Sequence, residues 1–408
     1  MHSIDSISTE TQTRQLPLAE FIVLMALFTA LIALSIDAML PALDIIGNDL
    51  NSTSPQQNYL IISLFFVGLA LGQLFFGPFA DARGRRLTIL VGLIIFMCGT
   101  AVCYLSTNIE ILLFGRIIQA FGLSGPRIAS MALVRDLYKG DAMARVMSLI
   151  MVIFILMPMV APLIGQFVMF WLGWRHIFSV FAVVAIISAT WFFLRQGETL
   201  PRANRVKFSW KNFSSSIKWL LNHPVVMGST LGMGTIFGAF LGYLSASQRI
   251  FTQIYDTGTY FPLIFALLSF SIGAASLFNS IMVMKLGMVK LVKWATIMSV
   301  VFSFCLLASV VVYLDKPPLW LFILIMFIGF FFIGILFGNL NSLAMEPVGH
   351  IAGVGAAFIG SFSTVISVVI GVFISQYVHD TLLPIGLGFT VFSILTYISV
   401  MYAIRHKQ

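Results

Sequence analysis

The feature that most constrains this chain is a run of apolar segments, each about twenty residues long or longer, the length a helix needs to cross a hydrocarbon core roughly 30 Å thick. Only 9% of the 408 residues are charged, whereas a soluble domain carries roughly a quarter. The sequence therefore predicts an all-α integral membrane protein with twelve transmembrane helices, at residues 18–40, 58–80, 87–106, 110–134, 144–171, 175–195, 224–253, 260–284, 290–313, 319–340, 351–378 and 384–404.

The distribution of positive charge predicts the orientation of these helices. If the amino terminus is cytoplasmic, eighteen of the 23 Lys and Arg residues fall on the cytoplasmic side. Only Arg175, Lys316 and Arg249 fall on or near the other side. Because cytoplasmic loops of membrane proteins are enriched in Lys and Arg, this bias predicts that both termini are cytoplasmic. The net charge of +8 is then a topology signal, and nucleic acid is not an expected partner.

The chain divides into two halves of six apolar segments each. We expect a cytoplasmic tail at 1–17, a six-helix bundle at 18–195, a linker at 196–222, a second bundle at 223–404 and a short tail at 405–408. A shift of about 203 residues places segment 58–80 on 260–284, and such repeated halves are a transporter architecture. The linker mixes basic and aromatic residues, which indicates an interfacial segment on the anionic leaflet. A regulatory or nucleic-acid patch is the alternative.

Several other classes of protein lack support in the sequence. The first apolar segment is not followed by a small-residue cleavage pattern, so it is interpreted as a membrane helix and not as a signal peptide. The three cysteines, Cys98, Cys103 and Cys305, fall inside apolar segments and indicate neither disulfides nor a metal site. No phosphate-binding glycine-lysine loop or catalytic cluster is found. We therefore expect no enzyme activity, no metal and no cofactor other than the proton.

A glycine-rich, charged loop follows the second apolar segment. Residues 77–86 read GPFADARGRR. Gly77 permits close approach of helices, and Gly84 permits a tight turn. Asp81 lies at a cytoplasmic helix end, where it can pair with a nearby arginine. We expect a charged lock that holds one conformation and opens in another, formed by Gly77, Asp81, Arg83, Gly84, Arg85 and Arg86.

This loop resembles the signature loop of the major facilitator superfamily. Further pieces appear in order: LSIDAMLPAL from 34, RIIQA from 116, VRDLY from 134, APLIG from 161 and GWRHIF from 173. Together they are similar to the Bcr/CflA branch, which exports drugs such as bicyclomycin and chloramphenicol in exchange for protons. The resemblance implies a major facilitator fold and proton-coupled export.

Three segments depart from the pattern of that family. Gln166 stands in the fifth segment where the antiporter motif usually has a second glycine, after an Ala161-Pro162 pair where Gly-Pro is usual. Met131 stands in the fourth segment where an arginine is common, with Arg127 one turn earlier. Ser247-Gln248-Arg249 replaces the usual Ser-Pro followed by an apolar residue.

Asp37 is the acidic residue that lies well inside a predicted membrane helix. An ionised carboxylate is costly there, so Asp37 is a candidate protonation site. Pro41 cannot donate a backbone hydrogen bond and should bend the helix at this point. Arg116 lies at a similar depth, and we expect it to pair with Asp37, so that substrate and proton compete at one pair. A purely structural ion pair is the alternative.

Other polar residues extend the candidate substrate site. Gln119 lies one turn from Arg116. Arg127 lies eleven residues from Arg116, on the same helix face and about 16 Å away; a structural anchor is the alternative. Arg249 is either a third cavity arginine or an interfacial one. Helix bends are expected at Pro41, Pro126, Pro158, Pro162 and Gly165, the last three either sealing against proton leak or simply packing helices.

These features predict a proton-coupled secondary transporter of small organic molecules, monomeric, in the lipid bilayer of a bacterial inner membrane. Because cavity arginines outnumber acids, we expect export of an anionic substrate, such as a polycarboxylate or siderophore. The alternatives are import of an anionic metal chelate, broad efflux of neutral and cationic drugs, and a membrane sensor that does not transport.

Overall fold

The computed structural model describes residues 16–407 apart from 139, 202–204 and 206–208. Every regular element in this part of the chain is helical. In the first half the helices are α1 (Leu18–Asp37), η1 (Leu40–Ala42), α2 (Leu43–Asp49), α3 (Pro55–Arg83), α4 (Arg85–Tyr104), α5 (Ile109–Leu137), α6 (Gly140–Leu172) and α7 (Arg175–Arg195).

The second half follows the linker helix α8 (Trp210–Asn222). Its helices are α9 (Pro224–Arg249), η3 (Ile250–Ile254), η4 (Gly258–Tyr260), α10 (Phe261–Leu286), α11 (Met288–Val312), α12 (Leu319–Met345), η5 (Glu346–Ile351), α13 (Ala352–Gln376) and α14 (Leu383–Arg405). Among the described residues, eleven helical spans are long and apolar enough to cross a membrane. The twelfth expected span is α6, which is 33 residues long and apolar over Leu156–Leu172.

Two single-residue turns show the correspondence of the two halves. Gly84 joins α3 to α4 with φ of 98°, and Gly287 joins α10 to α11 with φ of 78°. A left-handed backbone of this kind favours glycine, because a Cβ would crowd the carbonyl oxygen. The turns lie 203 residues apart, which matches the shift expected from the sequence.

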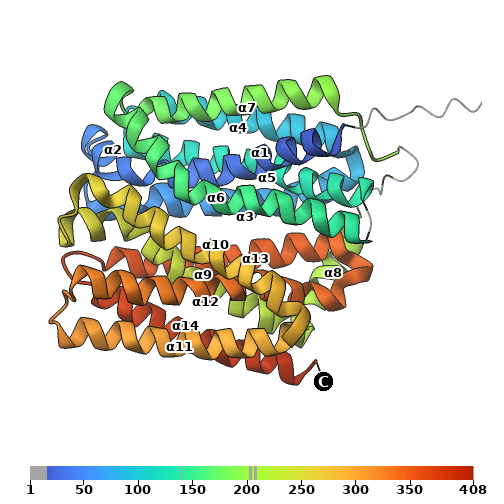
Figure 1. Ribbon diagram of the computed structural model, residues 1–408. Coiled ribbons are helices and arrows are strands. Elements are labelled where there is room, and N and C mark those ends of the chain that lie inside the picture. The colour runs from blue at the N-terminus through green and yellow to red at the C-terminus, as the bar shows by residue number, and fades with distance from the viewer. Residues whose placement is uncertain (1–15, 139, 202–204, 206–208, 408) are drawn as a thin grey trace, which may run out of the picture.

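The helices of each half pack mainly against one another (Figure 1). Between the halves, the main contacts run along α3 with α13 and along α6 with α10. The start of α1, α8 and the end of α14 lie at one end of the molecule, which we call the linker end. The loops after α2, α6, η3 and α11 lie at the other, which we call the opposite end.

Small residues bring the helices close together. A Cβ on Gly92 of α4 would lie 2.6 Å from the carbonyl oxygen of Gly122 on α5. In lipid, apolar surface gains little from leaving its solvent, so tight packing of this kind and interhelical hydrogen bonds supply much of the stability. The α4–α5 contact is the most extensive in the first half, and it fixes the position of α5.

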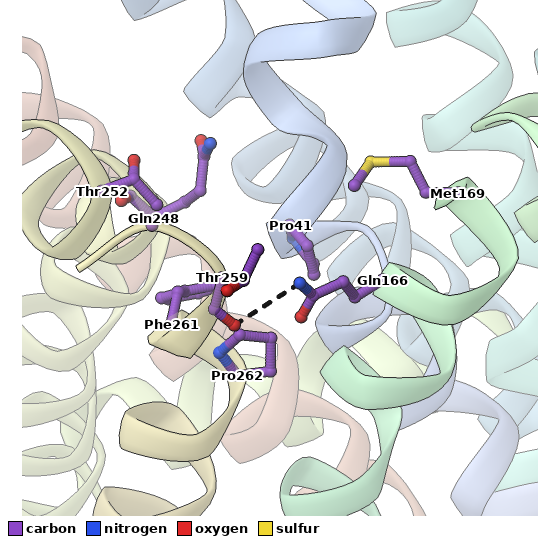
Figure 2. Close-up of a pocket in the computed structure, with 9 residues that line it drawn as sticks. Pro41, Gln166, Met169, Gln248, Thr252, Thr259, Phe261 and Pro262 are labelled. Carbon is purple, nitrogen blue, oxygen red and sulfur yellow. Dashed lines mark hydrogen bonds between the residues drawn. The ribbon is translucent and has the colours of Figure 1, made fainter. Parts of the chain in front are cut away.

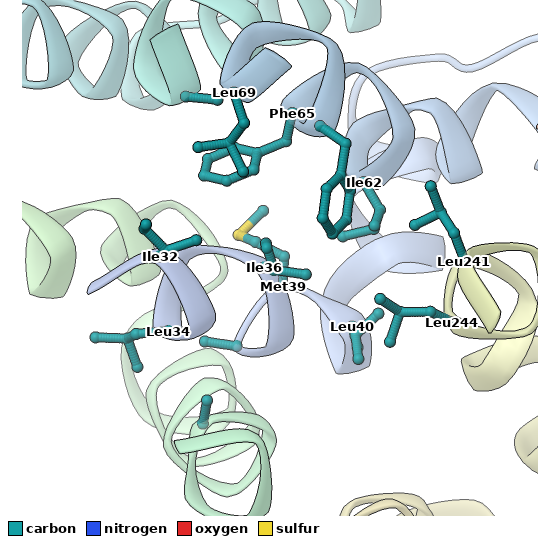
Figure 3. Close-up of a cluster of buried hydrophobic side chains, with 14 of the residues drawn as sticks. Ile32, Leu34, Ile36, Met39, Leu40, Ile62, Phe65, Leu69, Leu241 and Leu244 are labelled. Atoms are coloured by element: carbon teal, nitrogen blue, oxygen red, sulfur yellow. The ribbon is translucent and has the colours of Figure 1, made fainter. Parts of the chain in front are cut away.

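The buried apolar core joins both halves at the end of α1, in the first half of α3 and toward the end of α9 (Figure 3). Leu40 of η1 points toward Leu244 of α9, so the turn after α1 lies directly against the second half. Both side chains are buried. The same cluster includes Ile32, Leu34, Ile36, Met39, Ile62, Phe65, Leu69 and Leu241.

Candidate functional site

Asp37 is the last residue of α1, and its side chain is buried. The chain continues as a short 3-10 turn through Pro41. Because proline has no backbone N–H, it cannot donate the hydrogen bond that would continue the α-helix. Gly165 of α6 packs so closely on this turn that a Cβ there would collide with the carbonyl oxygen of Ala38. Within the described part of the chain, no hydrogen bond or ion pair to the Asp37 carboxylate is found.

Arg116 does not form the expected ion pair with Asp37. Its Nη2 donates to the carbonyl oxygen of Ser35 at 2.8 Å, and its Nε donates to the carbonyl oxygen of Ile61 at 3.2 Å. The guanidinium also lies over the ring of Phe65, 4.2 Å from its centroid. Because backbone carbonyls of α1 and α3 already accept its protons, the side chain is stabilised without a carboxylate. The prediction of an Asp37–Arg116 pair is wrong for this conformation.

Gln119 completes the environment of Arg116. Its Oε1 accepts from Arg116 Nη1 at 2.6 Å, and its Nε2 donates to Thr100 Oγ1 at 2.8 Å. Arg116 and Gln119 are both fully buried. These two residues therefore link α1, α3, α4 and α5, and in this state they are not exposed to a cavity.

Arg127 has a different environment on the same helix face. It lies three turns from Arg116 toward the linker end, and α5 runs through Pro126 without interruption. The Arg127 side chain is exposed, whereas Arg116 contacts α1 and α3. This face of α5 is otherwise directed at neighbouring helices, so the exposure shows that the helices leave space beside Arg127 toward the linker end. α6 likewise runs through Pro158 and Pro162.

An aromatic cluster lies where the two halves meet. Phe66 of α3 contacts Phe237 of α9 with ring centroids 5.6 Å apart, and Phe237 contacts Phe337 of α12 at 4.9 Å. Phe337 is 44% exposed. The cluster continues on α9 and α12 through Phe240, Tyr243 and Phe330. Rings on both halves with an accessible edge can bind an apolar or aromatic molecule.

Arg249 lies at the opposite end and does not extend the arginine face of α5. Its Nε donates to the carbonyl oxygen of His379 at 2.9 Å, and its Nη2 lies 3.4 Å from Asp380 Oδ1. These bonds hold the end of α9 to the loop between α13 and α14. Of the two alternatives raised by the sequence, the structure therefore favours the interfacial arginine.

Several hydrogen bonds join the two halves at the opposite end. Gln253 Nε2 donates to Asp44 Oδ2 at 2.8 Å, and Gln56 Nε2 lies 2.9 Å from His379 Nδ1. Gln166 Nε2 donates to the carbonyl oxygen of Thr259 at 3.4 Å. A fourth contact, between Ser63 and Ser245, is 3.5 Å long. The opposite end is thus closed in this state.

A pocket of about 170 Å³ lies in this seam between the halves (Figure 2). We call it the seam pocket. Its walls come from η1 and α6 of the first half and from α9, η3, η4 and α10 of the second. It is lined by Pro41, Gln166, Met169, Gln248, Thr252, Gly258, Thr259, Phe261 and Pro262.

The charged loop at the linker end forms a network centred on Arg85. Its Nη1 donates to Asp81 Oδ1 at 2.8 Å, and its Nε donates to Asp136 Oδ2 at 3.0 Å. Glu198 accepts from the backbone N–H groups of Arg85 and Arg86 at 3.0 and 3.1 Å. A carboxylate at the first N–H groups of a helix is stabilised by the helix dipole.

The other members of the predicted lock have separate surroundings. Arg86 Nη2 donates to the carbonyl oxygen of Phe193 at 2.7 Å, whereas Arg83 is exposed. A Cβ on Gly77 would lie 3.2 Å from Ala357 of α13, and a Cβ on Gly353 would lie 2.9 Å from Asp81 Oδ2. The loop therefore touches the second half as well as α5 and the linker.

Sequence reasoning missed three parts of this arrangement. Asp136 was noted only as part of a motif, although an acid in the last turn of the fourth helix beside a basic loop is a usable signal. Glu198 lies in the linker, where nothing in the local pattern marks it. The aromatic cluster could not be distinguished from the many other Phe residues, 39 in all.

Comparisons with known proteins agree with this architecture. The family model described as Major Facilitator Superfamily matches residues 25–372. An uncharacterized MFS-type transporter YdgK of Bacillus subtilis is 30% identical over 372 residues, covering 89% of this chain and 90% of that protein. The Bicyclomycin resistance protein homolog of Haemophilus influenzae is 28% identical over 373 residues, covering 89% and 91%. The structure of the human organic anion transporter MFSD10 matches with a TM-score of 0.72 at 18% identity, covering 95% of this chain and 100% of that one, a likeness of fold.

Proposed function

Because this chain belongs to the major facilitator superfamily, we propose that it is a proton-coupled transporter that exports small organic molecules by alternating access. The resemblance to the Bcr/CflA branch is confirmed by the relative named Bicyclomycin resistance protein homolog. Two six-helix bundles, residues 18–195 and 223–404, would move against each other around a central site. The positive charge of the loops supports a cytoplasmic location for the linker end, and with it for both termini, in a bacterium.

The state described here is then inward-facing. Hydrogen bonds that involve Asp44, Gln56 and Gln166 close the opposite end, which would be the periplasmic one. Arg127, toward the cytoplasmic end of α5, is exposed. A transporter in this state accepts substrate from the cytoplasm, as an exporter must at the start of its cycle.

The substrate class follows from the aromatic cluster more than from the arginines. Arg116 is fully used by carbonyl oxygens and Gln119, so it does not offer a free positive charge. Phe66, Phe237 and Phe337 offer ring faces and edges from both halves. We therefore favour a neutral or weakly cationic amphipathic molecule. An anionic substrate is the second candidate, because Arg127 is exposed on the interior face of α5.

Asp37 carries the proposal for proton coupling. It is buried in a membrane helix, 5% exposed, and lacks a cationic partner among the described residues. An acid in these surroundings is more easily kept neutral than ionised, so it can bind a proton in one state and release it when water or a charge approaches.

The test is proton flux in proteoliposomes that enclose a pH-sensitive dye, for the wild type and for Asp37→Asn. Neutral, cationic and anionic candidates are added separately, with the pH gradient imposed in each direction. We expect flux triggered by neutral or cationic amphipathic molecules and lost in Asp37→Asn. Flux that survives the substitution would remove Asp37 from the mechanism. Response to citrate-like anions alone would favour the second candidate, and no response to any candidate would favour a sensor.

A further inference from the structure

The seam pocket begins one helical turn from Asp37. Pro41 lines it, and Asp37 lies four residues earlier, across the 3-10 turn. On the other wall, Gln166 and Met169 follow Gly165, the residue that packs against Ala38. Both first-half walls of the pocket therefore continue from the place where α6 packs against the residue that follows Asp37.

The pocket carries polar groups that can hold water. Gln248 is 7% exposed, and its Oε1 has no hydrogen-bond partner in the described part of the chain. Gln166 and the carbonyl oxygen of Thr259 face each other across it (Figure 2). A volume of about 170 Å³ with several polar atoms is large enough for a small group of hydrogen-bonded water molecules.

Gln166 is one of the residues at which this chain departs from the pattern of its family. The usual glycine would leave the seam without a side chain at this point, whereas the Gln166 amide reaches from α6 of the first half to η4 of the second. The hydrogen bond to Thr259 is long, 3.4 Å, and therefore weak. A weak bond of this kind can exchange with water and return as the halves move.

We propose that the seam pocket is the path by which protons from the periplasmic side reach Asp37, and that Gln166 gates this path with Gln248 as its second polar wall. The inference rests on the proposed role of Asp37 as the protonation site. Two charged side chains at this end are held by other partners: Asp44 by Gln253, and Arg249 by the 379–380 loop. Asp256, in the turn between η3 and η4, is the acid nearest in sequence to the pocket, and it does not line it. Neutral amides thus line the route, and they can orient water without trapping the proton.

The test uses right-side-out membrane vesicles, in which the periplasmic face is outside. An acid pulse is applied outside, with substrate inside, and proton entry is followed with an internal dye. Gln166→Leu and Gln248→Leu are expected to slow entry by about tenfold, the effect of losing one stabilising hydrogen bond along the path. Gln166→Gly should raise substrate-independent proton entry. Gln56→Leu, which breaks a hydrogen bond across the same seam but outside the pocket, is the matched control: it weakens the closed end without changing the pocket, so it should not slow proton entry as the two pocket variants do.

A second measurement does not depend on proton coupling. In a background with Cys98, Cys103 and Cys305 replaced by Ala, Met169→Cys should react with a membrane-impermeant thiol reagent added outside. The proposal that the seam pocket is the proton path would be overturned if protons entered at the wild-type rate in both Gln166→Leu and Gln248→Leu. It would also be overturned if Gln56→Leu slowed proton entry equally. A Met169→Cys that is inert from outside would overturn it as well. If Asp37→Asn keeps coupled flux while Met169→Cys is labelled, the proposed function fails and the pocket remains an open periplasmic site.

Discussion

Replacing Arg116 with Met tests whether this arginine is held by backbone carbonyls or by an acid. α1 ends at Asp37, and the Met39 N–H bonds to the Ile36 carbonyl oxygen instead of that of Ser35. The Ser35 carbonyl is thus free for Arg116. The substitution would leave two buried acceptors, Ser35 O and Gln119 Oε1, without this donor. At roughly 1–3 kcal/mol for each buried unsatisfied group, the free energy of unfolding should fall by about 2–6 kcal/mol.

The assay is thermal unfolding of the purified protein in detergent, combined with two double-mutant cycles. Arg116→Met with Gln119→Leu should show a coupling of about 1–2 kcal/mol, because these side chains share a hydrogen bond. Arg116→Met with Asp37→Asn should be additive within about 0.5 kcal/mol, since the two side chains are not paired. If Asp37→Asn instead rescues Arg116→Met by more than about 1 kcal/mol, the two groups form a buried ion pair and the reasoning is refuted.

Three further changes test the linker end. Glu198→Ala removes the acceptor for the first N–H groups of α4 and should cost about 0.5–2 kcal/mol in thermal unfolding; Thr199→Ala, which removes only a neighbouring bond to Asp136, should cost less. Gly84→Ala puts a Cβ at φ of 98° beside the Glu198 carboxylate and should destabilise by about 1–3 kcal/mol; an unchanged melting temperature would contradict the tight turn. Partial burial lowers the pKa of His223 below its ordinary 6.5, so the stability of the α8–α9 junction should be complete above pH 6.5 and fall as the pH drops below it. His223→Gln should lose this dependence in melting curves taken across that range.

The helices were predictable because their signal is local. Each membrane helix must satisfy its own backbone hydrogen bonds, so length and apolar composition identify it without knowledge of its neighbours. The turn at Gly84 was likewise predictable, because only the local backbone needs glycine there. Burial of Asp37 and Arg116 also followed from their depth in the sequence.

The partners of these residues were not predictable, because they depend on distant segments. Arg116 bonds to Ser35 only because α1 ends two residues later and leaves that carbonyl open. Asp136 and Glu198 reach Arg85 across 51 and 113 residues. Arg249 was ambiguous because its surroundings depend on the 379–380 loop. Charge and depth gave the candidates, but three-dimensional packing decided which pairs form.

The two ends of the molecule differ in a way that bears on switching. At the linker end, Arg85 binds Asp81 and Asp136 within the first half, so this network can persist when the halves separate. At the opposite end, the bonds of Asp44, Gln56 and Gln166 cross the seam and must break when it opens. Each such bond contributes about 0.5–1.5 kcal/mol, and exposed ones less, so together they hold this end closed by only a few kcal/mol. Complete inversion of a two-state population needs roughly 5.5 kcal/mol. If proton binding at Asp37 drives the switch, as we propose, the pKa of this carboxyl must differ by about four units between the two states, because each unit corresponds to about 1.36 kcal/mol.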